Sequence, residues 1–371
     1  MVRSYARPGY YDPATTRSNF HVLLENQVTK LVGSGSPVKI TGVEYAKAKG
    51  QTVNTVKARK EVIVAAGAIG SPKILQLSGI GPAALSQKLG ITSLVDLPGV
   101  GSNYQDHSYS MTFNILGNAP PQIDDATAKE QYETEKTGPW TTSGPTAFAF
   151  LPLSKIADAS RAQALLSVAK AQSPAQYLRA GTPQAVVDGF AKQMEVLTTR
   201  LATDTMAASE LVFSAGPMMI SQQHPFSRGY VEITTNDPWT TPAIDFRYGS
   251  NPLDFDFVSE TIRFSRKALA TAPLQELAPQ ELSPGPQQTS DAQLKTWQQG
   301  QISTMFHSCC TNPMQPRNLG GVVDSNGVVY GTSNLRVVDA SIMPLIPATH
   351  PQSTVYALAE KIADAIKKAN A

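Results

Sequence analysis

Two histidines near the C-terminus and an adjacent cysteine pair are the residues of this chain best suited to proton or redox chemistry. His350 stands directly before a predicted terminal helix, and His307 precedes Cys309 and Cys310. The free amides and dipole at the start of a helix stabilise an anion, so a side chain at residue 350 would face such a place. Two histidines meeting there could divide proton transfer, one as the base and one as a hydrogen-bond donor. The alternative is two structural histidines and two small buried thiols.

The composition excludes several classes of protein. The chain has 371 residues with 31 basic and 29 acidic side chains, which leaves no electrostatic footprint for nucleic acid or an anionic membrane. Two adjacent cysteines exclude a disulfide framework and a cysteine-based zinc site, and we predict no metal. No G-x-S-x-G elbow supports a serine hydrolase. No apolar run approaches the roughly 18 residues of a membrane span, and the first residues lack the apolar core of a secretory signal. We therefore expect a cytoplasmic protein.

The first third of the chain is rich in predicted strands. Residues 20–32, 38–46 and 52–58 are separated by turn residues, which indicates an antiparallel meander. Residues 61–67 form a continuous apolar run that ends in small residues, typical of a strand buried on both faces of a parallel sheet. A helix capped by Ser71 is expected to follow. Such a junction of buried strand, tight turn and helix is typical of a site that faces a nucleotide or another anion.

The rest of the chain is predicted to mix helices and strands. Helices are expected over 157–170, 185–201 and 254–269, and strands over 229–235 and 334–339. The clearest helical pattern lies over 353–368, where five apolar residues share one face. These residues are Val355, Leu358, Ala359, Ile362 and Ile366.

Several long motifs resemble the glucose–methanol–choline (GMC) oxidoreductase family, in its fungal branch. Residues 67–81 resemble the second signature of the family, and residues 97–107 resemble its V-G-x-N-x-Q-D-H stretch. Residues 224–229 resemble the H-P-x-S-R-G stretch of the substrate domain, while 320–344 and 350–364 resemble the C-terminal block. The resemblance implies an enzyme that oxidises a primary or secondary alcohol by hydride transfer to the flavin of FAD.

The resemblance also assigns site residues. His307 matches the first active-site histidine of the family, and His350 matches the second position; both act on the substrate hydroxyl. Seven further residues match positions that contact FAD. They are Val28 (adenine), Ala66 and Gly67 (the turn beside adenosine), Asp339 and Ala340 (pyrophosphate and ribityl chain), and Gln352 and Ser353 (amides at the flavin pyrimidine edge).

The family's glycine-rich G-x-G-x-x-G segment has no counterpart in this sequence. We therefore expect an α/β fold of mixed character with an incomplete, Rossmann-like FAD-binding domain, 1–110 and 321–371, whose first βαβ unit is absent. A substrate-binding domain with an antiparallel sheet is expected over 111–320. A sheet edge and an apolar face would then be exposed. A separate N-terminal FAD-binding segment, a homo-oligomer or an inactive truncated form would each account for this.

The function therefore has more than one interpretation. The first is an FAD-dependent alcohol oxidase or dehydrogenase of fungal secondary metabolism, acting on a small-molecule alcohol. The second is a non-redox cyclase or dehydratase on the same scaffold, and the third is an inactive paralogue or subunit. Trp140, Phe148 and Phe150 are candidates for the substrate pocket, with a core role equally open for each.

Overall fold

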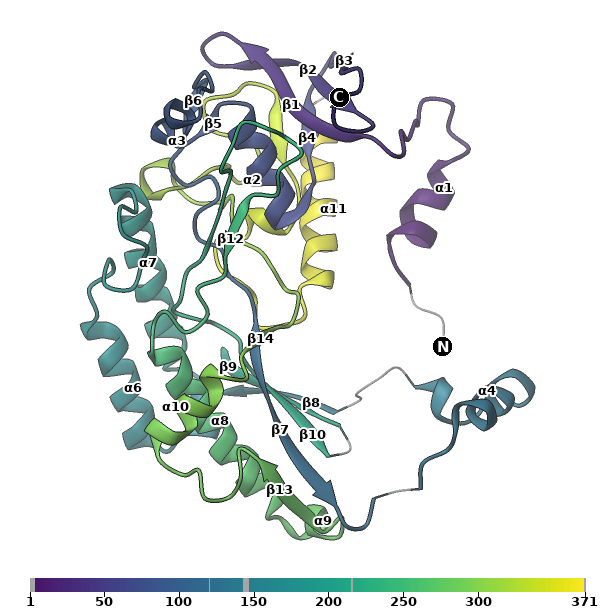
Figure 1. Ribbon diagram of the computed structural model, residues 1–371, viewed down its shortest axis with the longest axis vertical. Helices are drawn as coiled ribbons and strands as arrows, with labels where there is room; N and C mark the ends of the chain where they lie inside the picture. The colour runs from purple at the N-terminus through teal and green to yellow at the C-terminus, as the bar shows by residue number, and fades with distance from the viewer. Residues whose placement is uncertain (1–3, 120, 143–146, 215, 370–371) are drawn as a thin grey trace.

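A three-stranded antiparallel sheet follows two short helical elements at the start of the chain (Figure 1). The computed structural model describes residues 4–119, 121–142, 147–214 and 216–369. The sheet has the order β1-β2-β3, which confirms the predicted meander. Its strands are β1 (Gln27–Ser34), β2 (Lys39–Ala46) and β3 (Asn54–Lys57).

The predicted extension of the first strand back to residue 20 is wrong. Residues 20–24 form no strand, and Leu23 and Leu24 are 61% and 72% exposed. An apolar run becomes a strand only where a neighbouring strand pairs with it and a core covers it. Neither condition holds for this segment in the described chain.

Two parallel strands, β4 (Val62–Val64) and β15 (Leu335–Val337), pair although they lie more than 270 residues apart in the chain. They pair in register, so their carboxyl ends lie at the same edge. Val62 and Val64 are buried, but Ile63 between them is 47% exposed. The expectation of a strand buried on both faces is therefore wrong for β4, because the described residues leave the Ile63 face partly uncovered, whereas all three residues of β15 are buried.

Helix α2 (Gly67–Leu77) follows β4 and begins four residues before the predicted cap. Ser71 lies inside the helix, as does Pro72. A proline lacks the amide that would bond to the carbonyl four residues earlier, here Ala68. That carbonyl accepts instead from Thr311 Oγ1 at 2.6 Å. The proline therefore frees an acceptor that ties α2 to the segment after His307.

The largest sheet has the strand order β13-β7-β10-β9-β8, and β14 also pairs with β7. Long helices cover one side of this antiparallel sheet, as Figure 1 shows for α8, α10 and α6. The strands are β7 (Ser108–Leu116), β8 (Ala147–Pro152), β9 (Ala207–Phe213), β10 (Pro217–Gln222), β13 (Pro279–Ser283) and β14 (Ser303–Thr304), and the helices are α6 (Ala159–Ala171), α7 (Gln184–Arg200), α8 (Leu253–Leu269) and α10 (Asp291–Gln299).

The terminal helix α11 (Gln352–Ala369) agrees with the predicted helix, and its apolar face packs against β15 and α2 through a shared core. Shorter elements connect the larger ones. They are η1 (Arg7–Tyr11), α1 (Asp12–Ala14), β5 (Ile80–Gly81), α3 (Ala83–Lys88), β6 (Val95–Asp96), α4 (Asp125–Thr134), η2 (Pro139–Thr141), α5 (Leu153–Ile156), β11 (Tyr230–Glu232), β12 (Ala243–Asp245), α9 (Ala272–Gln275), η3 (Arg317–Leu319) and η4 (Ala340–Ile342).

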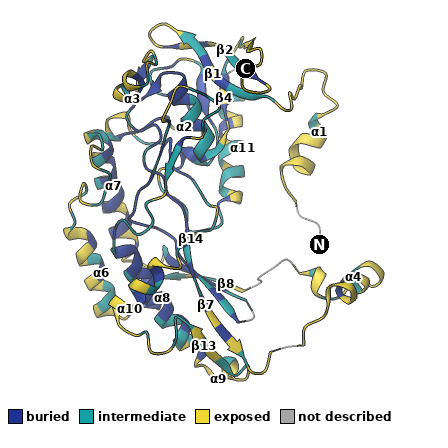
Figure 2. Cartoon of the chain, viewed as in Figure 1, coloured by how far each residue is buried: buried dark blue, intermediate teal, exposed yellow. Residues whose placement is uncertain are grey.

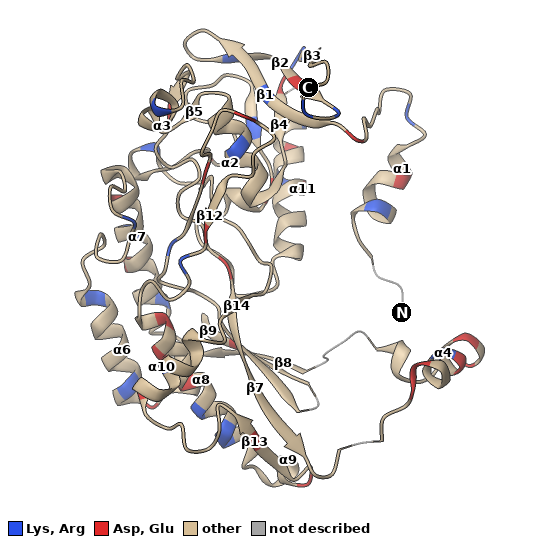
Figure 3. Cartoon of the chain, viewed as in Figure 1, with Lys and Arg blue, Asp and Glu red and all other residues tan. Residues whose placement is uncertain are grey.

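The buried apolar residues form separate clusters (Figure 2). One joins residues of 31–100 with residues of 322–362, including Leu75 and Val337. Another joins residues of 153–257, including Leu197 and Phe257, beneath the large sheet. Charges of both signs are interspersed over the described elements (Figure 3). Among the described residues, no helix combines the length and apolarity that a membrane crossing needs.

Candidate active site

Three imidazole rings converge between the large sheet and the start of α11. The ring centroids of His307 and His350 lie 5.5 Å apart, and those of His107 and His307 lie 5.0 Å apart. His107 directly precedes β7, His307 follows β14, and His350 precedes α11. The structure thus brings together the two histidines that the resemblance assigned, and it adds a third.

The side chain of Asp106 holds the loop that carries His307. Its Oδ1 accepts from the His307 backbone amide at 2.9 Å. Its Oδ2 accepts from Thr304 Oγ1 and from the Tyr248 hydroxyl, each at 2.5 Å. The pairing of β14 with β7 and the bond from Met305 N to the His107 carbonyl fix the same loop from the other side. The position of the His307 ring is therefore determined by several independent contacts.

Hydrogen bonds define which nitrogen of each ring carries the proton. His107 Nε2 lies 3.1 Å from the Gln223 carbonyl oxygen, which can only accept, so Nε2 is protonated. In neutral His107 the other nitrogen, Nδ1, is then an acceptor, and it lies 2.9 Å from His307 Nδ1. His307 must donate from Nδ1. A neutral His307 therefore keeps an unprotonated Nε2, which is the form of imidazole that accepts a proton.

The pKa values favour these neutral rings. Burial, followed by the neighbouring His307, lowers the pKa of His107 to about 3. Burial and the nearby His350 also lower the pKa of His307. Removing an imidazolium from water costs free energy, and two like charges at this distance repel each other. At neutral pH the pair is therefore uncharged.

His350 has a carboxylate partner that is fully buried. Its Nε2 lies 2.8 Å from Oε1 of Glu210, a residue of β9 with an exposed fraction of 0%. The other carboxylate oxygen accepts from Gln223 Nε2 at 3.2 Å. Burial raises the pKa of Glu210. The rings of Phe148 and Phe150 pack edge-on against the imidazole, with centroids at 5.2 and 5.9 Å.

A cavity of about 570 Å³ opens beside these rings, and we call it the imidazole cavity. Its polar lining consists mainly of the two family histidines and the start of α11, and the rest is apolar. Phe306 is 87% exposed beside it. The lining residues are Phe148, Val212, Met219, Met305, Phe306, His307, Ser308, Ala340, His350, Pro351, Gln352 and Val355.

The adjacent carboxyl ends of β4 and β15 carry four of the expected cofactor residues. Asp339 Oδ2 accepts from Gly67 N at 3.0 Å and from Ser71 Oγ at 2.5 Å. Ser71 Oγ in turn accepts from the amide of Ala66. Ala340 follows Asp339 and reaches the imidazole cavity. In open α/β sheets, ligands bind outside the carboxyl ends of parallel strands, and these residues lie there.

The remaining expected cofactor residues flank this edge. Gln352 and Ser353 are exposed at the start of α11, where helix amides are free, and Gln352 lines the imidazole cavity. Val28 is half-buried on β1, away from the carboxyl ends of β4 and β15 in the sequence. A Cβ at Gly67, whose φ is +77°, would meet nothing within 4 Å. The free space beside Gly67 and the exposed amides at the start of α11 fit an elongated, anionic cofactor.

Sequence reasoning missed three residues of this arrangement. Asp106 and His107 stand in the Q-D-H part of a motif that was identified, but their role was not. Glu210 lies within a strand without a recognisable motif. The residues next to it in the sequence give no sign of its contact with His350, which is 140 residues away. Of the proposed pocket aromatics, Phe148 lines the imidazole cavity, whereas Trp140 packs near Tyr132 beside α4 and does not line it.

The chain matches known proteins over nearly its whole length. Residues 2–109 and 225–359 match the two family models described as GMC oxidoreductase. The chain is 36% identical to the dehydrogenase xptC of Emericella nidulans, over 99% of this chain and 61% of that protein. It is 37% identical to the GMC oxidoreductase family protein Mala s 12 of Malassezia sympodialis, over 98% of this chain and 58% of that protein.

Solved structures agree. An FAD-dependent oxidoreductase from Chaetomium thermophilum superposes with a TM-score of 0.95 at 33% identity, over 99% of this chain and 65% of that one. A fungal aryl-alcohol oxidase superposes with a TM-score of 0.90 at 32% identity, over 98% and 63%. The chain thus spans about 60% of the length of the curated relatives it matches. The cofactor that these matches indicate is FAD, and the chain belongs to the GMC oxidoreductase family.

Proposed function

We propose that this chain provides the proton-handling site of an FAD-dependent alcohol oxidoreductase, in which Nε2 of His307 accepts the proton of the substrate hydroxyl. The observation that carries this proposal is the contact of 2.9 Å between the Nδ1 atoms of His107 and His307. Because His107 is held with its proton on Nε2, this contact leaves the second nitrogen of His307 as the acceptor.

Oxidation of an alcohol removes a proton from oxygen and a hydride from carbon, and it leaves a carbonyl group. His307 takes the proton at Nε2. His350 is held at Nε2 by the Glu210 carboxylate and, as the imidazolium of that pair, donates from Nδ1 to the substrate oxygen while His307 accepts its proton. FAD, when bound, supplies the two-electron acceptor for this reaction. Glu210, His107 and Asp106 touch neither substrate nor cofactor; they position the two rings.

The lining of the imidazole cavity supports an alcohol with a bulky apolar body. Phe148, Val212, Met219 and Val355 surround the histidines, and burial of apolar substrate surface against them is favourable. An aryl alcohol satisfies this lining, and similarity to a fungal aryl-alcohol oxidase points the same way. A role in fungal secondary metabolism remains a prediction from the family resemblance.

The cofactor would lie along the carboxyl ends of β4 and β15. Gly67, Asp339 and Ala340 would face its central part, and the amides at the start of α11 would face the flavin. We also propose the division into an FAD-binding part, 1–110 and 321–371, and a substrate-binding part, 111–320. The two largest apolar clusters each lie within one part and support that division, while two smaller clusters join the parts across their boundary.

The tautomers can be tested without the cofactor. In ¹⁵N-histidine-labelled protein at pH 7, NMR should show neutral His107 with its proton on Nε2 and neutral His307 with its proton on Nδ1. A His307 ring with its proton on Nε2 would contradict the proposal. The assignment uses spectra of His107→Gln and His307→Asn, with His21→Asn as the control, because His21 is exposed and remote from the cavity.

Turnover is tested with added FAD and p-anisyl alcohol under anaerobic conditions, where bleaching of the flavin absorbance reports oxidation. We expect bleaching by the full chain and not by His307→Asn. We also expect the chain alone to bind FAD weakly, because one face of β4 is uncovered; stoichiometric FAD retained through gel filtration would show this to be wrong. Substrate conversion by flavin-free protein would favour the non-redox alternative.

A further inference from the structure

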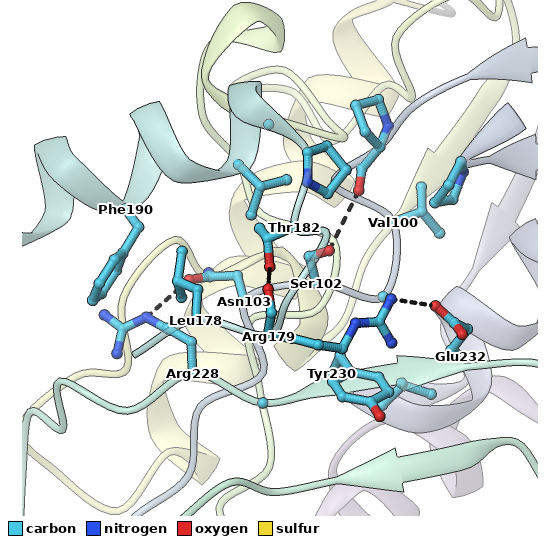
Figure 4. A pocket seen from close by; sticks show the side chains of 18 of the residues that line it. Val100, Ser102, Asn103, Leu178, Arg179, Thr182, Phe190, Arg228, Tyr230 and Glu232 are labelled. Atoms are coloured by element: carbon cyan, nitrogen blue, oxygen red, sulfur yellow. Dashed lines mark hydrogen bonds and ion pairs between the residues drawn. The ribbon is translucent and has the colours of Figure 1, made fainter. Parts of the chain in front are cut away.

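A second cavity, of about 280 Å³, is lined by residues of α3, α7 and β11. Figure 4 shows side chains that line it. It shares no lining residue with the imidazole cavity. Buried apolar side chains form much of its wall, including Val100, Val186 and Phe190. We call it the guanidinium cavity, because the side chain of Arg228 lines it.

Arg228 is a buried cation that makes no direct ion pair within the described residues. Only 4% of the residue is exposed, and its guanidinium bonds to amide and carbonyl oxygens alone. Burial lowers its pKa to about 10, the more distant buried carboxylate of Asp254 acts in the opposite direction, and the group stays charged at neutral pH. Burying a charge is costly unless it is paired, so a guanidinium without a directly bonded carboxylate beside a cavity favours an anionic occupant.

The hydrogen bonds of Arg228 leave room for such an occupant. Its Nη1 donates to the carbonyls of Pro225 and Ser227, and its Nε donates to Asn103 Oδ1 and Gln193 Oε1. Nη2 makes one bond, to Gln193 Oε1. A guanidinium has five N–H donors. One Nη2 hydrogen therefore has no acceptor in the part of the chain that the structure describes.

The other charged side chains that line the cavity are also mainly positive. Arg179 and Lys88 add two cations to the lining, and Glu232 is its one carboxylate. Glu232 is already bound to Arg179 Nη2 at 2.7 Å, and the Arg179 guanidinium lies over the ring of Tyr230 (Figure 4). Within the described residues the lining thus carries an excess of positive charge around an apolar interior.

The first turn of α7 also lies at the cavity wall. The helix has 17 residues and begins at Gln184, with Pro183 at its cap and no side-chain cap bond. Pro183 and Val186 both line the cavity, and the amide of Val186 donates to the Pro183 carbonyl. This turn therefore offers the cavity the positive end of the helix dipole, which agrees with the buried guanidinium, and no free donor.

From these features we infer that the guanidinium cavity is a binding site, separate from the imidazole cavity, for a small organic carboxylate with an apolar body. The carboxylate would accept from the free Nη2 hydrogen of Arg228, and the apolar body would contact Phe190, Val186 and Leu178. A guanidinium with a free N–H offers the charge-assisted bond that a carboxylate accepts best. The inference is independent of the proposed proton-handling role of His307.

The site can be tested with a matched pair of probes. The full chain is titrated with 4-fluorophenylacetate and, separately, with the neutral 4-fluorophenylacetamide, and ¹⁹F NMR line broadening reports binding. We expect the acid to bind at least about tenfold more tightly than the amide, because a hydrogen bond to a charged group contributes more than a neutral one. Equal affinity for the two probes would overturn the inference.

Two kinds of variant locate the binding. Leu178→Trp fills the cavity from its rim, where Leu178 is half-buried, and should weaken acid binding at least about tenfold. Leu282→Trp is the control, because Leu282 is 61% exposed on β13 and does not line the cavity. Arg228→Gln should remove the preference for the acid. If Arg228→Gln fails to fold, Leu178→Trp decides alone: unchanged binding in that variant, or loss of binding in His307→Asn, shows that the acid binds elsewhere.

Discussion

The two cavities place different ionisable groups in similar surroundings. Behind the wall of the imidazole cavity, where His107 contacts His307, burial lowers the pKa of His107 to about 3. In the guanidinium cavity, burial lowers the pKa of Arg228 to about 10. The direction and the cause are the same, namely loss of water around the charged form. The outcomes differ because the ordinary values lie on opposite sides of neutrality: burial makes the imidazole neutral and leaves the guanidinium charged.

The hydrogen-bond partners of the ionisable groups also differ between the two cavities. His307 and His350 are paired with groups that can themselves exchange protons, His107 and Glu210. Arg228 is held by amide and carbonyl oxygens that cannot. One cavity is therefore arranged to move a proton, and the other is arranged to keep a fixed charge. Each prediction below changes one side of this contrast.

The largest effect is expected for His307→Asn. The amide keeps a polar group of similar reach but cannot accept a proton, so we expect the rate constant of flavin reduction by p-anisyl alcohol to fall about a thousandfold. His350→Ala should likewise abolish oxidation without loss of the fold. Stopped-flow absorbance measures the rate, and far-UV circular dichroism checks the fold. Near-normal turnover in either variant would remove that residue from the catalytic role.

Glu210→Gln is expected to lower the same rate constant about 10- to 100-fold, because it replaces a hydrogen bond to a charged group by a neutral one. Glu195→Gln is the matched control, since Glu195 is exposed on α7. A purely structural role for Glu210 would lower the melting temperature and leave the pH dependence of the rate unchanged. A shifted pH profile with a preserved melting temperature would identify it as a positioning residue.

The buried imidazoles should make the fold sensitive to acid. Burial lowers the pKa of His107 to about 3 and that of His224 to about 4, against about 6.5 in the unfolded chain. Between these values the unfolded state binds more protons, so the free energy of unfolding is highest above pH 6.5 and falls as the pH falls. Each group should cost about 2 kcal/mol between pH 7 and pH 5. Urea unfolding at both pH values measures the loss, and His107→Gln should show less of it.

The smallest effect is expected at the guanidinium cavity. Because the pKa of Arg228 stays near 10, its charge does not change between pH 6 and pH 8. Affinity for 4-fluorophenylacetate should therefore vary less than about twofold over this range. The rate of flavin reduction should instead fall when the pH is lowered further, because burial lowers the pKa of His307 and its ring takes up a proton only at more acidic pH. Parallel pH dependence of the two measurements would show that both report one site.

The helices with clear apolar periodicity were predictable. The pattern over 254–269 corresponds to α8, and the pattern over 353–368 corresponds to α11, because amphipathic spacing is a local property of the sequence. The start of α2 was not predictable in the same way. Ser71 suggested a cap, but its hydroxyl bonds to Asp339, 268 residues away. Only the pairing of β4 with β15 brings that carboxylate into reach.

In the candidate site, too, some features were predictable from the sequence and others depend on the fold. The sequence contains His307 and His350 in family motifs, together with the glycine and small residues at the end of β4, and these alone indicate the family and its cofactor. The third imidazole, the carboxylate of Glu210 and the buried charge of Arg228 acquire their roles from contacts between residues more than 30 positions apart in the chain. Residue types determine which protons can move, but a tautomer or an unpaired charge depends on what lies opposite each nitrogen, and only folding decides that.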